Sequence, residues 1–361
     1  MLDEVVTVCA TPNMALVKYW GKRRLGEDCN DPALNLPRNS SLSITLDAGS
    51  ELLTRTSIVF SRKLKESAFY LDGKKQDLKN PELQERFLAF ERLRELSGVD
   101  AKVLVVSKNS FPTASGLASS ASGLAAFVLA AAKALGLKLS NEELSGIARI
   151  GSGSACRSLF GGFVKWSRGS RPDGSDSIAT QVFDEKHWPG FVDVIAIASQ
   201  EKKKISSRAG MRQTVETSEL YKLFTLSAET DVGRISDAIR KRDFDATGRI
   251  IMSSSMMMHA TMLDTKPPIM YLNDVSRRII YAMEELNATE GRIVAAYTFD
   301  AGPNANIITL EKDRTKVQAC LGEVDGIEKV FAAKVGSGPK ALGSGESLID
   351  EHKLVPKATG K

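Results

Sequence analysis

The side chains with the clearest chemical potential in this 361-residue sequence are an aspartate in a turn and several groups of basic and hydroxyl residues. Asp300 lies in the segment YTFDAGPNA, where an apolar run meets a Gly-Pro turn. An aspartate in a turn commonly caps its own backbone, but its carboxylate can also accept a hydrogen bond or a proton from a substrate hydroxyl. The sequence alone leaves both interpretations open.

Three basic or aromatic side chains that could bind an anion lie near the N-terminus, in the segment ATPNMALVKYWGK. They are Lys18, Tyr19 and Lys22, and they flank Trp20. The simpler interpretation is that the lysines are surface charges beside a buried tryptophan. The alternative is that they are drawn together around an anionic ligand.

A further concentration of polar groups occurs in GSGSACRSLFGG, which contains Ser152, Ser154 and Arg157. A guanidinium can hold a carboxylate through two parallel hydrogen bonds, so Arg157 is a candidate carboxylate-binding residue. A structural arginine that bridges two loops is the alternative. Ser207 and Arg208, in the segment SSRAGM, form a similar pair farther along the chain.

A small-residue segment, PTASGLASS, directly precedes an Ala-rich run with high helix propensity. Unpaired amides and hydroxyls at the positive end of a helix suit a polyphosphate, although an ordinary capped helix is the simpler interpretation. Neither GxxxxGK[ST] nor GxGxxG occurs in the sequence. The candidate phosphate-binding residues are Ser115, Gly116, Leu117, Ala118, Ser119 and Ser120.

The elements that must position these residues are both strands and helices. Apolar or alternating runs predict strands at 5–10, 41–46, 102–107, 191–199, 292–299, 305–310 and 329–333. Periodic segments predict helices at 82–97, after residue 118, at 140–150, over most of 200–286 and between 310 and 329. We therefore expect an α+β protein with two lobes, at 1–188 and 189–335, followed by a partly disordered tail at 336–361.

Composition limits the class of protein. Hydrophobic residues make up 42% and charged residues 26% of the chain, as in soluble globular proteins, and no apolar run is long enough for a bilayer. The four cysteines lack CxxC spacing and the first residues are acidic, so we expect free thiols and a cytoplasmic protein. The three histidines lack metal-ligand spacing. The net charge is +5, and the basic residues are interspersed with acidic ones.

Six motifs between Ala10 and Pro303, namely the five quoted above and HATMLDT at 259–265, resemble in the same order those of the GHMP kinase superfamily. The chain is identified as a member of its decarboxylase branch. Ala118 gives GLASS, as in that branch, where the kinases usually carry GLGSS. The resemblance implies a ribosomal-protein-like N-terminal lobe, a ferredoxin-like C-terminal lobe and a homodimer.

The resemblance also implies an activity: ATP-dependent decarboxylation of (R)-5-diphosphomevalonate to isopentenyl diphosphate, ADP, phosphate and CO2, in isoprenoid and sterol biosynthesis. Asp300 would act on the tertiary hydroxyl, Arg157 would hold the carboxylate and Lys18 would neutralise charge. The residues implied at the substrate diphosphate are Tyr19, Lys22, Ser152, Ser154, Ser207 and Arg208, while the PTASGLASS segment would bind ATP and, through Ser119 or Ser120, Mg2+.

Other functions compete with this one. A superfamily kinase for mevalonate or phosphomevalonate would share the ATP loop but would not need Arg157 as a carboxylate clamp. A catalytically silent ATP-binding member would not need Asp300, Lys18 and Arg157 together. A nucleic-acid binder would use basic patches interleaved with aromatic residues, which the sequence lacks. We therefore expect a small-molecule substrate, no nucleic-acid partner and no membrane association.

Overall fold

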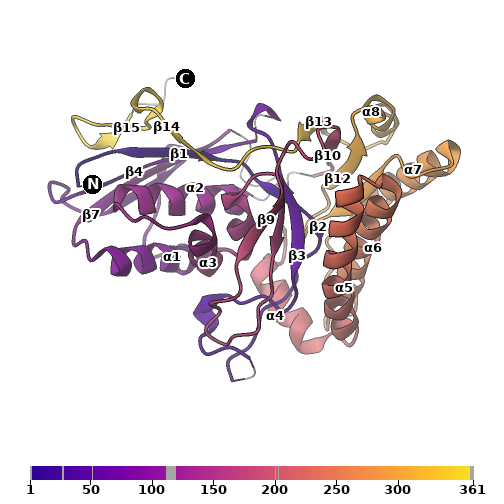
Figure 1. Ribbon diagram of the computed structural model, residues 1–361, viewed down its shortest axis with the longest axis horizontal. Helices are drawn as coiled ribbons and strands as arrows, with labels where there is room; N and C mark the ends of the chain where they lie inside the picture. The colour runs from indigo at the N-terminus through magenta and orange to yellow at the C-terminus, as the bar shows by residue number, and fades with distance from the viewer. Residues whose placement is uncertain are drawn as a thin grey trace.

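The computed structural model describes residues 2–26, 28–50, 52–110, 119–199, 201 and 203–357, which form two lobes of sheet and helix (Figure 1). The N-terminal lobe contains a six-stranded sheet in the order β14-β1-β4-β7-β5-β6, in which only β5 and β7 pair in parallel. Its strands are β1 (Val6–Ala10), β4 (Thr54–Ser61), β5 (Ala68–Leu71), β6 (Lys74–Lys75), β7 (Lys102–Asn109) and β14 (Lys340–Leu342).

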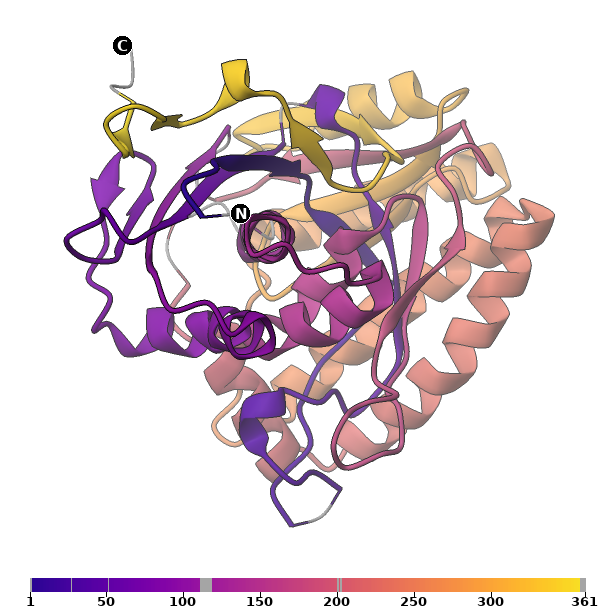
Figure 2. The ribbon, with the colours of Figure 1, turned by 60° about the vertical axis from the view of Figure 1, so that its left-hand side comes forward.

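Three helices cover one face of this sheet: α1 (Pro81–Ser97), α2 (Ser119–Ala134) and α3 (Asn141–Gly151) (Figure 2). The expected helix at 82–97 is confirmed, because Asn80 accepts hydrogen bonds from the first amides of α1 and Gly98 ends it at φ 63°. Ser140 and Glu143 form a capping box at the start of α3, which confirms the helix expected at 140–150.

A second sheet, in the order β2-β3-β8-β9, connects the N-terminal lobe to the helices of the other lobe. Its strands are β2 (Asn13–Val17), β3 (Ser41–Thr45), β8 (Phe163–Trp166) and β9 (Ala179–Phe183). Short 3-10 helices lie in the connections of this lobe, at η1 (Pro32–Leu34), η2 (Ala48–Ser50) and η3 (Gly153–Leu159).

The C-terminal lobe is built on a sheet in the order β11-β12-β10-β13. Its strands are β10 (Phe191–Ile197), β11 (Ala296–Phe299), β12 (Ala305–Leu310) and β13 (Lys329–Lys334), and its helices are α4 (Ser207–Thr217), α5 (Tyr221–Lys241), α6 (Phe244–Leu263), α7 (Asp274–Glu290) and α8 (Arg314–Gly322). Helices α5 and α6 share one core with β2, β3 and one face of this sheet, while α7 and α8 pack on the opposite face. The two lobes are therefore joined through a common core.

The strand expected at 292–299 begins only at Ala296. Before that residue, the side chain of Asn287, rather than a neighbouring strand, bonds the backbone. The amides of Val294 and Ala295 both donate to Asn287 Oδ1, at 2.8 and 3.0 Å, and Asn287 Nδ2 donates to the carbonyl of Ala295 at 2.8 Å. These backbone groups are satisfied without a neighbouring strand, so a buried apolar sequence forms an ordered bend.

The tail, which was expected to be partly disordered, forms regular structure in its described residues. Strand β14 pairs with the edge of β1, and η4 (Ser344–Glu346), β15 (Ile349–Asp350) and β16 (Val355–Pro356) follow it. Ile349 is fully buried against Val59 and Leu104, on the sheet face opposite α1. The polar composition concealed this role, because a few apolar residues suffice to cover an otherwise open edge and face.

Strand β9 ends at Phe183 and β10 begins at Phe191, so the expected lobe boundary at residue 188 lies in the connection between them. Among the helices that the structure describes, none combines the length and apolar character that a bilayer crossing requires.

Packing of the tail predicts a measurable effect of Ile349→Ala. Loss of a fully buried isoleucine side chain should reduce the free energy of unfolding by about 2–5 kcal/mol, as in other core truncations. Denaturant unfolding would measure it, with Val355→Ala as the control, because Val355 is 45% exposed. Equal stability of the two variants would contradict the packing described here.

Candidate functional site

The centre of the candidate site is an ion pair between the two lobes. Lys18 follows β2 and Asp300 follows β11, and Lys18 Nζ lies 2.7 Å from Asp300 Oδ1. The Lys18 side chain is only 1% exposed, whereas Asp300 is 38% exposed. A buried ammonium group is costly unless a carboxylate pairs with it, so the partner of Lys18 is fixed while Asp300 keeps an open side for a ligand.

Both members of the pair are held by adjacent serines of α6. The backbone amide of Lys18 donates to Ser254 Oγ at 3.0 Å, and the amide of Phe299, the residue before Asp300, donates to Ser255 Oγ at 2.9 Å. One helix thus sets the position of two residues that are 282 positions apart in the sequence.

The protonation states follow from burial and charge. Burial lowers the pKa of Lys18, and the nearby Asp300 carboxylate opposes this effect. Burial acts to raise the pKa of Asp300, but the charge and hydrogen bond of Lys18, with help from Arg157 and Lys203, hold it below its ordinary value. The pair is therefore an ammonium group and a carboxylate, and Asp300 can accept a hydrogen bond.

Arg157, on η3, is buried beside this pair and is held only by neutral groups among the described residues. Its Nε donates to Asn13 Oδ1 at 3.2 Å and to Ser43 Oγ at 3.1 Å, and its Nη1 donates to Ser41 Oγ at 2.8 Å. A buried guanidinium without a carboxylate partner is suited to bind one from a ligand. The structure thus brings Arg157 together with Lys18 and Asp300, as the proposed clamp requires.

The expected diphosphate-binding residues form a group of cations and hydroxyls close to Arg157. Burial, with the charges of Arg208 and Arg212, lowers the pKa of Lys22 to about 7. Arg208 donates to the carbonyl of Gly151 at 2.6 Å and pairs with Glu85. Accumulated positive charge of this kind favours an anionic ligand.

The remaining candidates lie around this group. The Tyr19 hydroxyl is buried without a hydrogen bond to any described residue, and its ring packs 4.7 Å from Trp166. The hydroxyls of Ser152 and Ser154 lie 3.3 Å apart, and the Ser207 hydroxyl accepts a hydrogen bond from Lys203 at 2.9 Å.

Sequence reasoning missed the residues that support the site. Asn13, Ser41 and Ser43 hold Arg157, and Lys203 reaches the Asp300 turn through the carbonyl of Ala301 at 3.2 Å. The alternation in Ser41–Thr45 predicted the strand, and it also carried the signal for two hydroxyls on one face. His259, one of the three histidines without metal-ligand spacing, is buried with its ring edge-on to Phe299.

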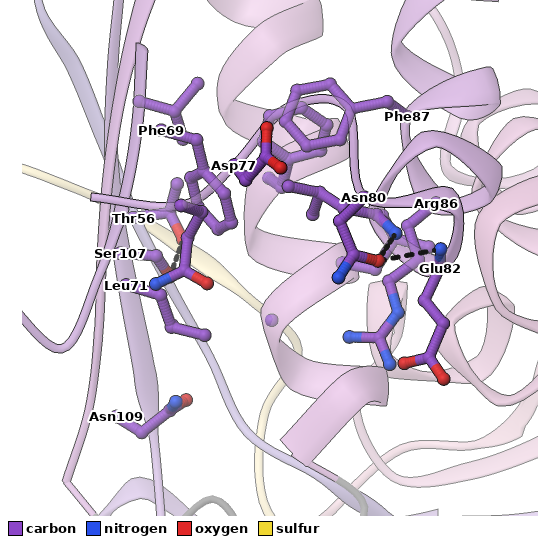
Figure 3. Close-up of a pocket in the computed structure, with 16 residues that line it drawn as sticks. Thr56, Phe69, Leu71, Asp77, Asn80, Glu82, Arg86, Phe87, Ser107 and Asn109 are labelled. Carbon is purple, nitrogen blue, oxygen red and sulfur yellow. Dashed lines mark hydrogen bonds between the residues drawn. The ribbon is translucent and has the colours of Figure 1, made fainter. Parts of the chain in front are cut away.

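A cavity of about 240 Å3 lies between the six-stranded sheet and helices α1 and α2 (Figure 3). Apolar walls come from residues such as Phe69, Phe87 and Phe127, and polar groups come from Ser107 on β7 and from Asn80. The cavity reaches α2 at Gly123, four residues after the helix begins at Ser119. It was not anticipated from the sequence, because its walls come from five separate elements.

In the sequence, the candidate phosphate-binding segment falls between β7, which ends at Asn109, and α2, which begins at Ser119. Ser115, Gly116, Leu117 and Ala118 lie outside the residues that the structure describes. Ser119 and Ser120 form the first turn of α2. Within the described part of the chain, no group of three or more His, Cys, Asp and Glu side chains is arranged to hold a metal ion.

Comparison with known families agrees with the resemblance. Residues 10–179 match a model described as the diphosphomevalonate decarboxylase-like N-terminal domain, and residues 193–324 match the mevalonate 5-diphosphate decarboxylase C-terminal domain. Among curated relatives, the diphosphomevalonate decarboxylase of Debaryomyces hansenii is 40% identical over 387 aligned positions, covering 97% of each chain. That of Homo sapiens is 45% identical over 318 positions, covering 85% of this chain and 77% of the human protein.

Solved structures show the same similarity. Mevalonate diphosphate decarboxylase from Trypanosoma brucei superposes with a TM-score of 0.85 at 35% identity, covering 96% of this chain and 100% of that chain. MDDEF in complex with MVAPP, AMPPCP and magnesium superposes with a TM-score of 0.82 at 34% identity, covering 94% and 99%. The expected two-lobe GHMP-kinase-type fold is thereby confirmed.

The lowered pKa of Lys22 predicts proton uptake when an anion binds. At pH 7.5 a lysine with a pKa of about 7 is mostly neutral, and an anion beside it raises the pKa. Pyrophosphate binding should therefore take up most of one proton at pH 7.5 and weaken as pH rises from 7 to 9. Calorimetry in buffers of different ionisation enthalpy measures this uptake.

Lys22→Met should abolish the proton uptake, whereas Lys74→Met, in the exposed strand β6, should leave it unchanged. Unchanged uptake by Lys22→Met would assign the proton to another group.

Proposed function

The chain belongs to the diphosphomevalonate decarboxylase family and is a decarboxylase; we propose that it converts (R)-5-diphosphomevalonate and ATP into isopentenyl diphosphate, ADP, phosphate and CO2. The observation that carries the residue assignments is the Lys18–Asp300 pair with Arg157 beside it, buried and bonded only to neutral described groups. These groups offer a hydrogen-bond acceptor, a compensating cation and a carboxylate clamp in one place.

The chemistry explains why these groups are needed together. A 3-hydroxy acid lacks an electron sink for decarboxylation, and hydroxide is a poor leaving group. Transfer of the ATP γ-phosphoryl group to the tertiary hydroxyl creates a better one. Cleavage of that C–O bond then builds positive charge on the tertiary carbon, and the electrons of the breaking bond to the carboxylate carbon form the new alkene as CO2 leaves.

Asp300 orients the tertiary hydroxyl and accepts its proton as the O–P bond forms, and its negative charge then stabilises the electron-poor carbon. Its lowered pKa fits this role, because an ionised carboxylate is required at neutral pH. Lys18 holds Asp300 at 2.7 Å and offsets negative charge between the substrate and the incoming phosphoryl group.

Arg157 holds the departing carboxylate group in place, since its described partners leave its charge uncompensated. The diphosphate end lies against Lys22, Tyr19 and Arg208, with the hydroxyls of Ser152, Ser154 and Ser207 nearby. Binding the diphosphate at one end and the carboxylate at the other fixes the tertiary hydroxyl beside Asp300.

The nucleoside of ATP fits the cavity between the six-stranded sheet, α1 and α2, with its phosphates directed to the start of α2. The mixture of aromatic walls and amide or hydroxyl groups suits a purine and a ribose. Residues 115–118 with Ser119 and Ser120 would hold the phosphates at the positive end of the helix. When bound, Mg2+ neutralises phosphate charge, and the hydroxyl of Ser119 or Ser120 is a suitable oxygen ligand for it.

The alternative of a mevalonate or phosphomevalonate kinase is not supported, because the family and curated matches reported above are decarboxylases. Placement in sterol biosynthesis, cytoplasmic residence and a homodimer are further parts of this proposal that rest on the resemblance.

Parallel assays of CO2 and ADP test the proposed reaction. With ATP, Mg2+ and 5-diphosphomevalonate, the protein should release the two products in equal amounts. Asp300→Ala and Arg157→Ala should each reduce the rate by roughly 100-fold or more, as expected for loss of a proton acceptor or of a transition-state contact. ADP without CO2 would instead indicate a kinase.

The control is Asp325→Ala, because Asp325 is an exposed aspartate outside the site. Its rate should equal that of the wild type. If it fell as far as that of Asp300→Ala, the assay would be reporting general damage to the protein.

Gly123→Leu tests the nucleoside cavity separately. A Cβ at Gly123 meets no atom within 4 Å, so the backbone accepts a side chain that projects toward the cavity, and glycine replacement favours the helix. The KM for ATP should rise at least about tenfold while the thermal midpoint holds or increases, since each 1.4 kcal/mol of lost binding is tenfold. An unchanged KM for ATP would mean that the nucleoside binds elsewhere. The matched control is Gly233→Leu, because a Cβ at Gly233 also meets no atom within 4 Å.

A further inference from the structure

Asp193 is a buried carboxyl group to which the mechanism above gives no role. It is the only charged residue in the apolar strand β10, and it is fully buried. It lies opposite Ile308 on β12 and Ala333 on β13, which belong to the core shared with β2 and α6. Its side chain therefore faces the elements that carry Lys18 and the two serines that position the ion pair.

Two other buried polar side chains share this face of the sheet. Asn306 on β12 lies opposite Ile195 and Thr298, and side chains two residues apart on a strand face the same way. Neither carboxyl oxygen of Asp193 makes a hydrogen bond to any described residue, and the same holds for Thr298 Oγ1 and Asn306 Oδ1. A polar patch in an otherwise apolar core destabilises the fold, so the carboxyl group calls for a physical explanation.

The charges that act on Asp193 are those of the catalytic pair. Lys18 on the β2 side favours the ionised form, whereas Asp300 opposes it. His259 faces the same region from α6, but burial lowers its pKa to about 4, so it is neutral. Burial dominates and, with Asp300, raises the pKa of Asp193 to about 8 despite Lys18.

We propose that Asp193 is a positioning residue that remains protonated beneath the Lys18–Asp300 pair, so that the Lys18 ammonium is committed to Asp300 alone. Ionised Asp193 would be a second carboxylate competing for the same buried ammonium group. Asp300 would then be held less firmly in its open position. This inference rests on the proposed function, because it concerns how the proposed proton acceptor is oriented.

Ionisation of Asp193 should make kcat fall at alkaline pH. If only the form with protonated Asp193 is active, kcat at saturating substrate should fall about tenfold between pH 7 and pH 9 for a pKa of about 8. Asp193→Asn keeps the shape and the neutral charge, so its kcat should be close to wild type at pH 7 and nearly constant up to pH 9. Saturating substrate removes the separate effect of Lys22 on binding.

Stability provides a second readout that does not require activity. A folded-state pKa raised above the ordinary value of 3.8 means that the unfolded chain releases a proton which the folded chain keeps, so stability falls as pH rises from about 4 to 8. The thermal midpoint of Asp193→Asn minus that of the wild type should therefore grow between pH 5 and pH 8. Asp325→Asn, at an exposed position, should show no such trend.

The outcomes separate the two proposals. Absence of CO2 release by the wild type would overturn the proposed function, whereas CO2 release with the same alkaline limb in Asp193→Asn would overturn only the role of Asp193. A midpoint for Asp193→Asn that falls below wild type as pH rises would mean an ionised Asp193 paired with Lys18, and would also overturn it. If Asp193→Asn does not fold, Asp193→Val is expected to give the same flat alkaline limb.

Discussion

The burial of one ammonium group constrains the architecture of the whole site. Lys18 is almost completely removed from solvent and must have a carboxylate partner, and that partner comes from a turn near the other end of the chain. The pair can form only if the lobes share a core, which α5 and α6 provide by packing against β2, β3 and the C-terminal sheet. The packing that holds the two lobes together therefore also sets the geometry of the site.

Charge is distributed unevenly around that pair. Arg157 is held by amide and hydroxyl oxygens, and Lys22 lies among other cations, so positive charge is left over in the part of the site that the structure describes. A substrate with a carboxylate at one end and a diphosphate at the other compensates both excesses at once. The protein therefore accumulates electrostatic strain that a dianionic or more highly charged ligand relieves.

The Asp193 carboxyl group represents the opposite case, an acid that low dielectric surroundings keep neutral. Within one small region a buried lysine remains charged, a half-exposed aspartate remains ionised and a fully buried aspartate holds its proton. These different states follow from how closely each group approaches an opposite charge and how completely it is removed from water. The residue type alone does not assign them.

The sequence by itself determined local features: the helices at 82–97 and 140–150, several of the strands and the motifs that carry Lys18, Arg157 and Asp300. These signals are contained in short segments, so periodicity, turn chemistry and family resemblance detect them. Only the tertiary structure decided that Ser254 and Ser255 position the ion pair, that Asn13 and Ser41 hold Arg157 and that the tail completes the N-terminal sheet. The tertiary structure also buries Asp193 on the face that packs against β2 and α6. Each of these depends on contacts between residues far apart in the chain, where burial and partner, rather than local pattern, fix what a side chain does.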